Sequence, residues 1–331
     1  MDLDLVFLGT AASLPTAQRG AAALLVRRGG DRLLFDCGEG TQRQLQRSAI
    51  GLPELEEIFL THFHADHVLG LPGMLKTFAL RGRDETPLTV YGPRGVRELF
   101  ASLQPFVGRL PYPLAIVPLE PGERLERGEY AIEAFAVDHG VAALGYALVE
   151  AERPGRFDTA AADALGVPAG PLRGRLQAGE PVTLPDGRAV TPSEVLGEPR
   201  PGRKLVLTGD TAPSPLVVQA AHRADLLVHE ASFSREEAAR ARQTLHSTAA
   251  EAAEVARLAQ VRLLALTHVS PRYLGPELEQ EARAVFPDTV VPRDFDSVEV
   301  PFPERGAPRL VPRGARRGAR ERPEVPMIDP S

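Results

Sequence analysis

Six short apolar runs, each followed by a histidine or an acidic residue, are the feature that most constrains the fold of this chain. The runs and the polar residues after them are 33–35 with Asp36, 58–60 with Thr61 and His62, 134–137 with Asp138 and His139, 205–207 with Thr208, Gly209 and Asp210, 226–228 with His229 and Glu230, and 263–266 with Thr267 and His268. Runs of this length and composition are typical of buried strands. Side chains at the carboxyl ends of strands gather at one edge of a sheet. The pattern therefore predicts an α/β protein in which distant segments build a single site.

The densest of these endings is the heptad 61–67, which reads Thr-His-Phe-His-Ala-Asp-His and holds three of the eight histidines in the chain. Imidazole and carboxylate groups are the usual nitrogen and oxygen ligands of divalent metals. Such a cluster is costly in a core unless it binds an ion, so we interpret it as a metal site. The alternative is a structural cluster of polar residues without a metal.

Spacing within the heptad indicates two metal ions rather than one. His62 and His64 are two residues apart, so an extended backbone points both to the same side. Asp66 and His67 turn into the following helix and do not easily reach the same ion. Two ions about 3.5–4 Å apart need a bridging group, and Asp210 is the candidate carboxylate.

Two further histidines are candidates to complete this pair of sites. His139 would complete the first site and His268 the second. Each of them, like Asp210, is equally consistent with a surface loop when taken alone. Their joint occurrence, in this order and always after an apolar run, favours metal ligation.

Composition limits the classes of protein that remain. The net charge of −6 argues against a broadly basic surface, so any contact with RNA is expected to be local and no DNA partner is expected. No apolar run is long enough to span a bilayer and no signal peptide is recognisable, which predicts no membrane association. Cys37 is the only cysteine, so no internal disulfide can form. We expect Cys37 in the core and the protein in the cytoplasm.

Two segments lack the periodicity of the rest. Residues 150–203 are rich in Pro and Gly, and residues 150–204 carry eight basic and eight acidic side chains, so the segment is no simple basic patch. A structureless segment of this size in a compact domain is improbable, and we interpret it as an insertion with a function. Residues 303–331 are rich in Pro and Arg, and we expect them to be disordered. A solvated tail is the simpler interpretation of them, and contact with RNA the alternative.

Several motifs in consistent order give the chain a family resemblance. The pattern His-x-His-x-Asp-His resembles the metallo-β-lactamase superfamily. Four more specific motifs resemble the ribonuclease Z family, the endonucleases that mature tRNA 3′ ends: Asp-Cys-Gly-Glu-Gly-Thr-Gln at 36–42, Thr-Gly-Asp-Thr at 208–211, His-Glu-Ala-Ser-Phe at 229–233 and His-Ser-Thr-Ala at 246–249. Ser232 stands where threonine is common and Leu245 where a small residue is expected. Neither departure removes a functional group.

The resemblance implies a fold and a division of the chain. It implies an α/β (α+β) fold, the αββα four-layer sandwich, with residues 1–302 as the catalytic domain and 150–203 as a protruding tRNA-binding arm. Gly170 and Pro171 match the Gly-Pro element of that arm, and the nearby Arg173 and Arg175 are candidate RNA contacts, with solvated charges as the alternative. The family also implies a homodimer.

The resemblance further assigns roles to the site residues. Two Zn²⁺ ions per subunit are implied, with Mn²⁺ or Mg²⁺ as possible substitutes. The ions would supply hydroxide to attack the phosphodiester of precursor tRNA, leaving a 3′-hydroxyl on the tRNA and a 5′-phosphate on the trailer. The implied set is His62, His64 and His139 on one ion, Asp66, His67 and His268 on the other, Asp210 as the bridge, Asp66 also as an aid to the water, His246 as proton donor to the leaving oxygen, and Glu230 as its partner.

Some site residues have simpler interpretations. His246 could be only a polar residue beside a helix. Asp36 is expected to hold a histidine N–H, and Thr41 to cap a helix. His222 and His229 are assigned no role in the chemistry.

Three other functions stay open on the same fold. A small-molecule hydrolase, such as a phosphodiesterase, lactonase or arylsulfatase, is the main alternative, although such an enzyme has no use for the arm. A non-catalytic RNA-binding relative is disfavoured because every inferred ligand is intact. A redox enzyme would need iron, and nothing in the sequence selects iron over zinc.

Overall fold

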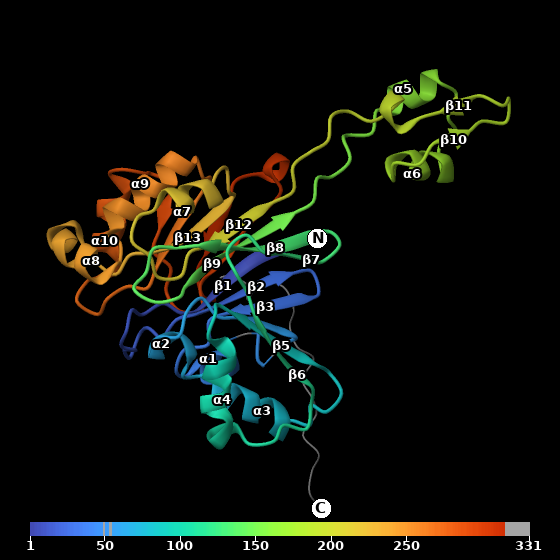
Figure 1. Cartoon of the computed structure of the whole chain (residues 1–331). Coiled ribbons are helices and arrows are strands. Elements are labelled where there is room, and N and C mark those ends of the chain that lie inside the picture. Colours follow the sequence, from blue (N-terminus) through green and yellow to red (C-terminus); the bar gives the residue numbers. More distant parts are fainter. Residues whose placement is uncertain (49, 53–54, 315–331) are drawn as a thin grey trace, which may run out of the picture.

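Two large β-sheets packed face to face form the body of the protein (Figure 1). The computed structural model describes residues 1–48, 50–52 and 55–314. The first sheet, in spatial order, contains β17 (Arg309–Val311), β16 (Ser297–Glu299), β1 (Leu3–Gly9), β2 (Ala23–Arg28), β3 (Asp31–Phe35), β4 (Glu57–Phe59), β5 (Leu88–Gly92) and β6 (Leu114–Pro118). The second contains β15 (Thr289–Val290), β14 (Leu264–Thr267), β13 (Leu226–Glu230), β12 (Lys204–Leu207), β9 (Leu144–Glu150), β8 (Tyr130–Ala136) and β7 (Arg124–Glu126).

Helices cover the outer face of each sheet. Those of the amino-terminal half are α1 (Thr41–Arg47), α2 (Ala65–Val68), α3 (Leu71–Leu80) and α4 (Val96–Val107). Those of the other half are α7 (Pro215–Ala220), η2 (Arg235–Glu237), α8 (Ala238–Thr244), α9 (Ala249–Ala259) and α10 (Gly275–Arg283). In α9 the buried alanines recur at helical spacing. Thr248 and Glu251 close a capping box at its start, which fixes where this helix begins.

Three apolar cores match this layering. One lies between the sheets, where the rings of Phe35 and Phe59 stack at 5.0 Å and Tyr146 packs against both. A second joins the first sheet to α1, α3 and α4, and a third joins the second sheet to α7, α9 and α10. The helix–sheet–sheet–helix order confirms the expected αββα sandwich.

All six apolar runs lie in strands of these two sheets. β3 and β4 are parallel neighbours in the first sheet, and β12, β13 and β14 are parallel neighbours in the second. Their carboxyl ends therefore open toward the same region, as the sequence pattern predicts.

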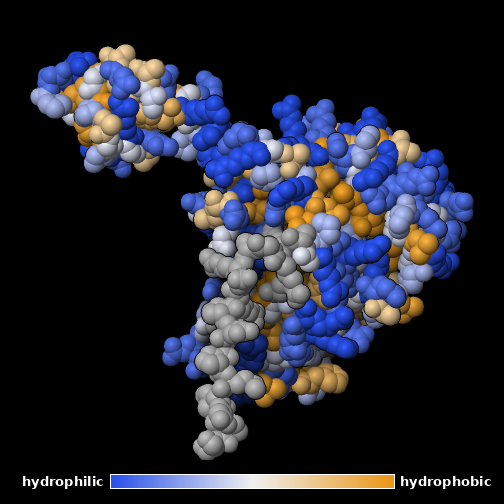
Figure 2. All heavy atoms as spheres, turned by 180° about the vertical axis from the view of Figure 1, so that it is seen from behind, coloured by the Kyte–Doolittle hydropathy of each residue, from blue (hydrophilic) through white to orange (hydrophobic). Residues whose placement is uncertain are grey.

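The insertion at 150–203 is not structureless, in keeping with the expectation that a structureless segment of this size is improbable. It contains α5 (Thr159–Ala164), α6 (Pro171–Gln177), β10 (Val182–Thr183), β11 (Ala189–Val190) and η1 (Pro192–Glu194). These pack around a small core that includes Val167, Leu176 and Val190. Its elements span two to seven residues, too few for periodicity to reveal. Figures 1 and 2 show this unit standing clear of the body, and we call it the arm.

The expectation of disorder from residue 303 onward is wrong as far as residue 314. Residues Pro303–Arg305 form the short helix η3, and β17 pairs with β16 at the edge of the first sheet. Arg309 binds Glu299 across this pair. The ladder hydrogen bonds of β16 order the segment, and a three-residue edge strand has no periodicity to detect. The remainder of the expected tail, 315–331, lies outside the described residues.

Within the residues described, no helix is both long and apolar enough to cross a membrane.

Candidate metal centre

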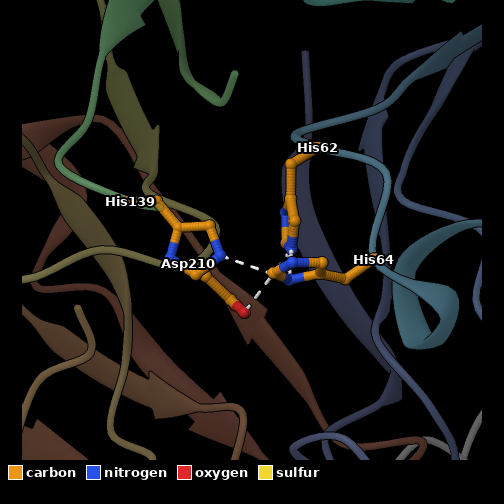
Figure 3. A group of neighbouring side chains, drawn as sticks. All are labelled: His62, His64, His139 and Asp210. Carbon is orange, nitrogen blue, oxygen red and sulfur yellow. Dashed lines mark hydrogen bonds and ion pairs between the residues drawn. The ribbon is translucent and has the colours of Figure 1, made fainter. Parts of the chain in front are cut away.

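Three histidines and an aspartate converge on one point between the two sheets (Figure 3). His62 and His64 follow β4, and His139 follows β8. His62 Nε2 lies 3.0 Å from His64 Nδ1, which in turn lies 3.3 Å from His139 Nε2. Asp210, which follows β12, places Oδ2 3.6 Å from His62 Nε2. These are the residues predicted for the first ion.

A second group lies beside the first. Asp66 and His67 are in α2, and His268 follows β14. His67 Nε2 lies 3.3 Å from His268 Nε2, which lies 3.2 Å from Asp66 Oδ2. These are the residues predicted for the second ion.

Asp210 lies between the two groups, as a bridging ligand must. Its Oδ1 is 3.4 Å from both His67 Nε2 and His268 Nε2, while Oδ2 faces His62. Asp210 is buried, and among the described residues Oδ1 has no hydrogen-bond partner. A buried carboxylate oxygen without a donor is the kind of atom that a cation satisfies.

Hydrogen bonds on the far side of the second group fix the protonation of its rings. His67 Nδ1 lies 2.8 Å from Asp36, whose carboxylate can only accept, so this nitrogen carries the proton. Ser232 donates its own hydroxyl proton to Glu230, so it accepts from His268 Nδ1 at 2.9 Å.

In the neutral rings, both Nε2 atoms therefore present lone pairs to each other across 3.3 Å. That arrangement is repulsive unless a positive charge lies between them. The donor set thus fits a divalent metal, and the two partners of the far nitrogens are the kind that orient metal-binding imidazoles.

The charges of the group are also suited to a cation. Burial, together with His67, lowers the pKa of His62 to about 2, so this ring is a neutral ligand. Burial disfavours charge on Asp66, but the hydrogen bond from His268 and the nearby imidazoles outweigh it and hold its pKa well below the usual value. Burial likewise opposes charge on His67, yet Asp210 and Asp36 raise its pKa well above the usual value, so a proton on Nε2 can supply the positive charge that a metal ion would otherwise place there. The ionised carboxylates therefore attract a positively charged group to this site.

His246 and Glu230 form a separate pair at the edge of the centre. Glu230 ends β13 and is buried, and His246 lies between α8 and α9. His246 Nδ1 donates to Glu230 Oε1 at 2.6 Å. Burial favours the neutral ring, but this hydrogen bond outweighs it and raises the pKa of His246 to about 9. His246 is therefore protonated at neutral pH.

Leu245 also contributes to the centre, through its backbone. It adopts a left-handed conformation with φ 55°, which is uncommon for a leucine. Its carbonyl accepts from His139 Nδ1 at 3.2 Å, which leaves His139 Nε2 free to face the metal position. The residue that departs from the family pattern thus orients a predicted ligand.

Two positioning residues were not predicted from the sequence. Ser232 links Glu230 to His268 through one hydroxyl, and the backbone N–H of Ser13 donates to Asp66 at 2.8 Å. Ser232 lies in one of the family motifs, but a serine in place of threonine gives no sign of this double contact. Ser13 carried no signal, because the contact is made by its backbone.

The structure also shows the positions of the residues that were expected to support the centre or to lie outside it. Asp36 bonds His67 as expected. The prediction that Thr41 caps a helix is wrong, because Gly40 is the N-cap of α1 and the Thr41 hydroxyl donates to the carbonyl of Gly38. Cys37 is buried in the core and His222 is exposed. His229 is buried outside the ligand groups, with Nδ1 bonded to the backbone.

The candidate RNA contacts lie in the arm, apart from this centre. Gly170 precedes α6 and Pro171 begins it. Arg173 bonds the carbonyl of Val167 and the carboxylate of Asp163 within the arm. Arg175 is more exposed and pairs with Glu180. Their contact with RNA stays a prediction.

Comparison with known proteins agrees with this geometry. A family model described as the metallo-beta-lactamase superfamily matches residues 17–268. Ribonuclease Z of Gemmatimonas aurantiaca is 50% identical over 309 residues, which cover 92% of this chain and 98% of that protein. Ribonuclease Z of Myxococcus xanthus is 52% identical over 272 residues, which cover 82% and 88% of the respective chains. The crystal structure of the short form of human tRNase Z has a TM-score of 0.66 at 26% identity, covering 90% of this chain and 99% of that one.

The fold and the matched model place this chain in the metallo-β-lactamase superfamily. The identity with curated relatives over nearly their full length shows that it belongs, within that superfamily, to the ribonuclease Z family. It is accordingly a metal-dependent endoribonuclease by family.

Proposed function

We propose that this protein removes 3′ trailers from precursor tRNA, leaving a 3′-hydroxyl on the tRNA and a 5′-phosphate on the trailer. The observation that carries the proposal is the combination of seven side chains placed so that they could hold metal ions with the His246–Glu230 pair at their edge. The names of the relatives supply the substrate class. A ligand cluster alone would support only a metal-dependent hydrolase.

The donor set favours two zinc ions per subunit. Five imidazoles in two groups match the preference of zinc for nitrogen ligands, and Mn²⁺ or Mg²⁺ would be weaker substitutes. When bound, such ions lower the pKa of water and polarise a phosphoryl oxygen.

His246 is the proton donor to the leaving 3′-oxygen. With a pKa of about 9 it carries its proton at neutral pH, and its Nδ1 is held by Glu230. Its Nε2–H is the group left for the substrate. Glu230 sets the ring orientation and stabilises its positive charge.

Asp66, which belongs to the second ligand group with His67 and His268, orients the attacking water. Its pKa is held low, so it stays ionised and accepts hydrogen bonds only. The Ser13 N–H at 2.8 Å limits its rotation. Holding the water in one direction lowers the entropic part of the barrier.

A cavity of about 390 Å³ opens beside His246 and suits a phosphate backbone. Its lining includes Ser13, Phe233 and the guanidinium-bearing Arg240 and Arg272. Arginine binds phosphate through paired donors. The substrate strand thus has a positively charged approach to the proton donor.

The catalytic domain extends from residue 1 to residue 311, beyond the boundary at 302 expected from the sequence, because β17 belongs to its first sheet. The arm within 150–203 binds the tRNA body, with Gly170, Pro171 and Arg175 as contacts. The arm reaches away from the body (Figure 1), which suits a homodimer in which one subunit's arm serves the other subunit's site. The location is proposed as cytoplasmic.

The test is cleavage of a tRNA precursor bearing a 3′ trailer, with and without a chelator. Cleavage near the discriminator base that stops with the chelator supports the proposal, and mature tRNA without a trailer is the control. Rapid hydrolysis of a small phosphodiester without cleavage of the precursor would overturn it in favour of a small-molecule hydrolase.

A further inference from the structure

The arm is joined to the body by a narrow ribbon of two chain segments. These are residues 151–158, which leave β9, and 195–203, which lead into β12. They pair through isolated bridges, with the backbones of Arg153 and Arg200 hydrogen-bonded in both directions at 2.8 Å. Among the described residues, the small core of the arm shares none with the three cores of the body, so the direction of the arm depends on what holds this ribbon.

The root of the ribbon is held by a buried ion pair. Arg203 binds both oxygens of Glu150 at 2.7 Å, and Arg28 of β2 binds the same carboxylate at 2.8 Å. Arg203 also donates to the carbonyl of Val300 at 3.0 Å. This fixes one point of the ribbon to both sheets. A ribbon fixed at one point can still swing about it.

A second point of attachment lies further out, on the segment that follows β16. Glu304 accepts from Arg153 at 2.8 and 3.1 Å and from Arg200 at 3.1 Å, so one carboxylate holds both sides of the ribbon. The guanidinium of Arg153 also lies 3.6 Å from the centroid of Phe302, and that of Arg203 lies 4.1 Å from it. Two fixed points along a ribbon define its direction.

We propose that Phe302 and Glu304 form a clasp that sets the direction of the arm and thereby positions bound tRNA relative to the metal centre. These are positioning residues, since they hold the ribbon through Arg153 and Arg200 and touch no reacting group. The proposal rests on the proposed function only where it concerns tRNA. The orientation of the arm itself can be measured without any substrate.

The first experiment measures that orientation directly. Gly30→Cys on the body and Gly174→Cys on the arm supply spin-label sites, because a Cβ at either position meets nothing within 4 Å. The native Cys37 is buried and does not compete for label. We expect pulsed electron paramagnetic resonance to give a narrow distribution of distances between the two spin labels. In Glu304→Ala and in Phe302→Leu this distribution should broaden or shift. Glu299→Gln is the matched control, because Glu299 is a nearby acidic residue at the end of β16 that pairs with Arg309. An unchanged distribution in folded Glu304→Ala and Phe302→Leu overturns the clasp.

The second experiment measures the consequence for cleavage. If the free arm spends one third of its time in the productive direction, KM for precursor tRNA rises about threefold. kcat and the hydrolysis of bis(p-nitrophenyl) phosphate are expected to be unchanged, which a damaged metal centre would not allow. A shared loss of kcat on both substrates would assign Glu304 to general stability and overturn the positioning role. Should the wild type fail to cleave precursor tRNA, the proposed function fails, while the distance measurement still decides the clasp.

Discussion

The metal centre and the arm are held in place in opposite ways. In the centre, ligands follow strands of two packed sheets, and the far nitrogens of His67, His139 and His268 are each bonded to a fixed partner. The arm has only a small core of its own and meets the body through a two-segment ribbon. The proposed chemistry thus lies where the two sheets meet, and the proposed recognition depends on a unit attached to the body by few contacts. We therefore expect variants of the metal centre to change mainly kcat, and variants of the arm to change mainly KM for precursor tRNA.

The largest effect is expected from Asp210→Ala, which removes the bridge between the two ligand groups. Loss of a charge at the heart of the centre should lower kcat/KM by about 10³-fold or more. Metal content, measured by mass spectrometry, should fall together with activity on both precursor tRNA and a small diester. Asp186→Ala, at an exposed aspartate of the arm, is the control. Full metal content in Asp210→Ala would contradict the bridging role.

His246→Ala should separate chemistry from metal binding. Removal of a general acid slows reactions by about 10²–10⁴-fold, and we expect kcat to fall in this range with metal content retained. His222→Ala, at an exposed histidine outside the centre, should behave like the wild type. Loss of metal in His246→Ala would instead make it a ligand, a possibility raised by its proximity to Asp210 and His268.

Excision of the arm should affect only the substrate that is large enough to touch it. The N–H of Asp158 bonds the carbonyl of Val195, so an Asn-Gly turn can join these residues in place of 159–194. Loss of a contact surface that includes binding hot spots should raise KM for precursor tRNA by roughly 30-fold. Hydrolysis of bis(p-nitrophenyl) phosphate should stay at the wild-type rate. An unchanged KM for the precursor would remove the arm from recognition.

The pH dependence of cleavage should report the His246–Glu230 pair. The acid form of His246 is present below its pKa of about 9 and is lost as the pH rises through that value, so kcat should fall above about pH 9. Glu230→Gln removes the charge that raises this pKa, so the fall should begin at lower pH. Single-turnover rates from pH 6 to 10 measure both. An alkaline limb that does not move in Glu230→Gln would argue against His246 as the donor.

The smallest effect is expected from a single charge on the arm. If Arg175 contacts a phosphate, Arg175→Ala should reduce the salt slope of log K for precursor tRNA by about 1, with kcat unchanged. Arg257→Ala, on α9 of the body, is the control. Arg173→Ala should instead lower the stability of the arm, because Arg173 bonds Val167 and Asp163 internally.

The centre could be predicted because its geometry follows from strand ends. His62 and His64 on one extended segment, and Asp210 and His268 after parallel strands, needed only the rule that such ends share an edge. The roles of Glu230 and His246 do not follow from that rule. Their roles came from a family resemblance, since His246 lies in a loop between α8 and α9 that no pattern places near β13.

The arm and the carboxyl-terminal segment show where sequence patterns fail. The two-residue strand β10 and the three-residue strand β17 are too short for an alternating pattern to be recognised in the sequence. Composition predicts that Glu304 lies in a disordered tail, whereas in the structure it binds both Arg153 and Arg200. Such contacts depend on where distant segments meet in space, which local composition does not encode.

The ligands come from both sheets, and this gives the centre a mechanical role as well as a chemical one. The heptad follows a strand of the first sheet, whereas His139, Asp210 and His268 follow strands of the second. A chain with one cysteine has no internal disulfide, so bound ions would act as its cross-link between layers. An ion at 100 times its dissociation constant stabilises the folded state by about 2.7 kcal/mol. Chelation should therefore weaken the packing between the two sheets. The supply of metal in the cell would then govern the lifetime of the folded protein as well as its activity.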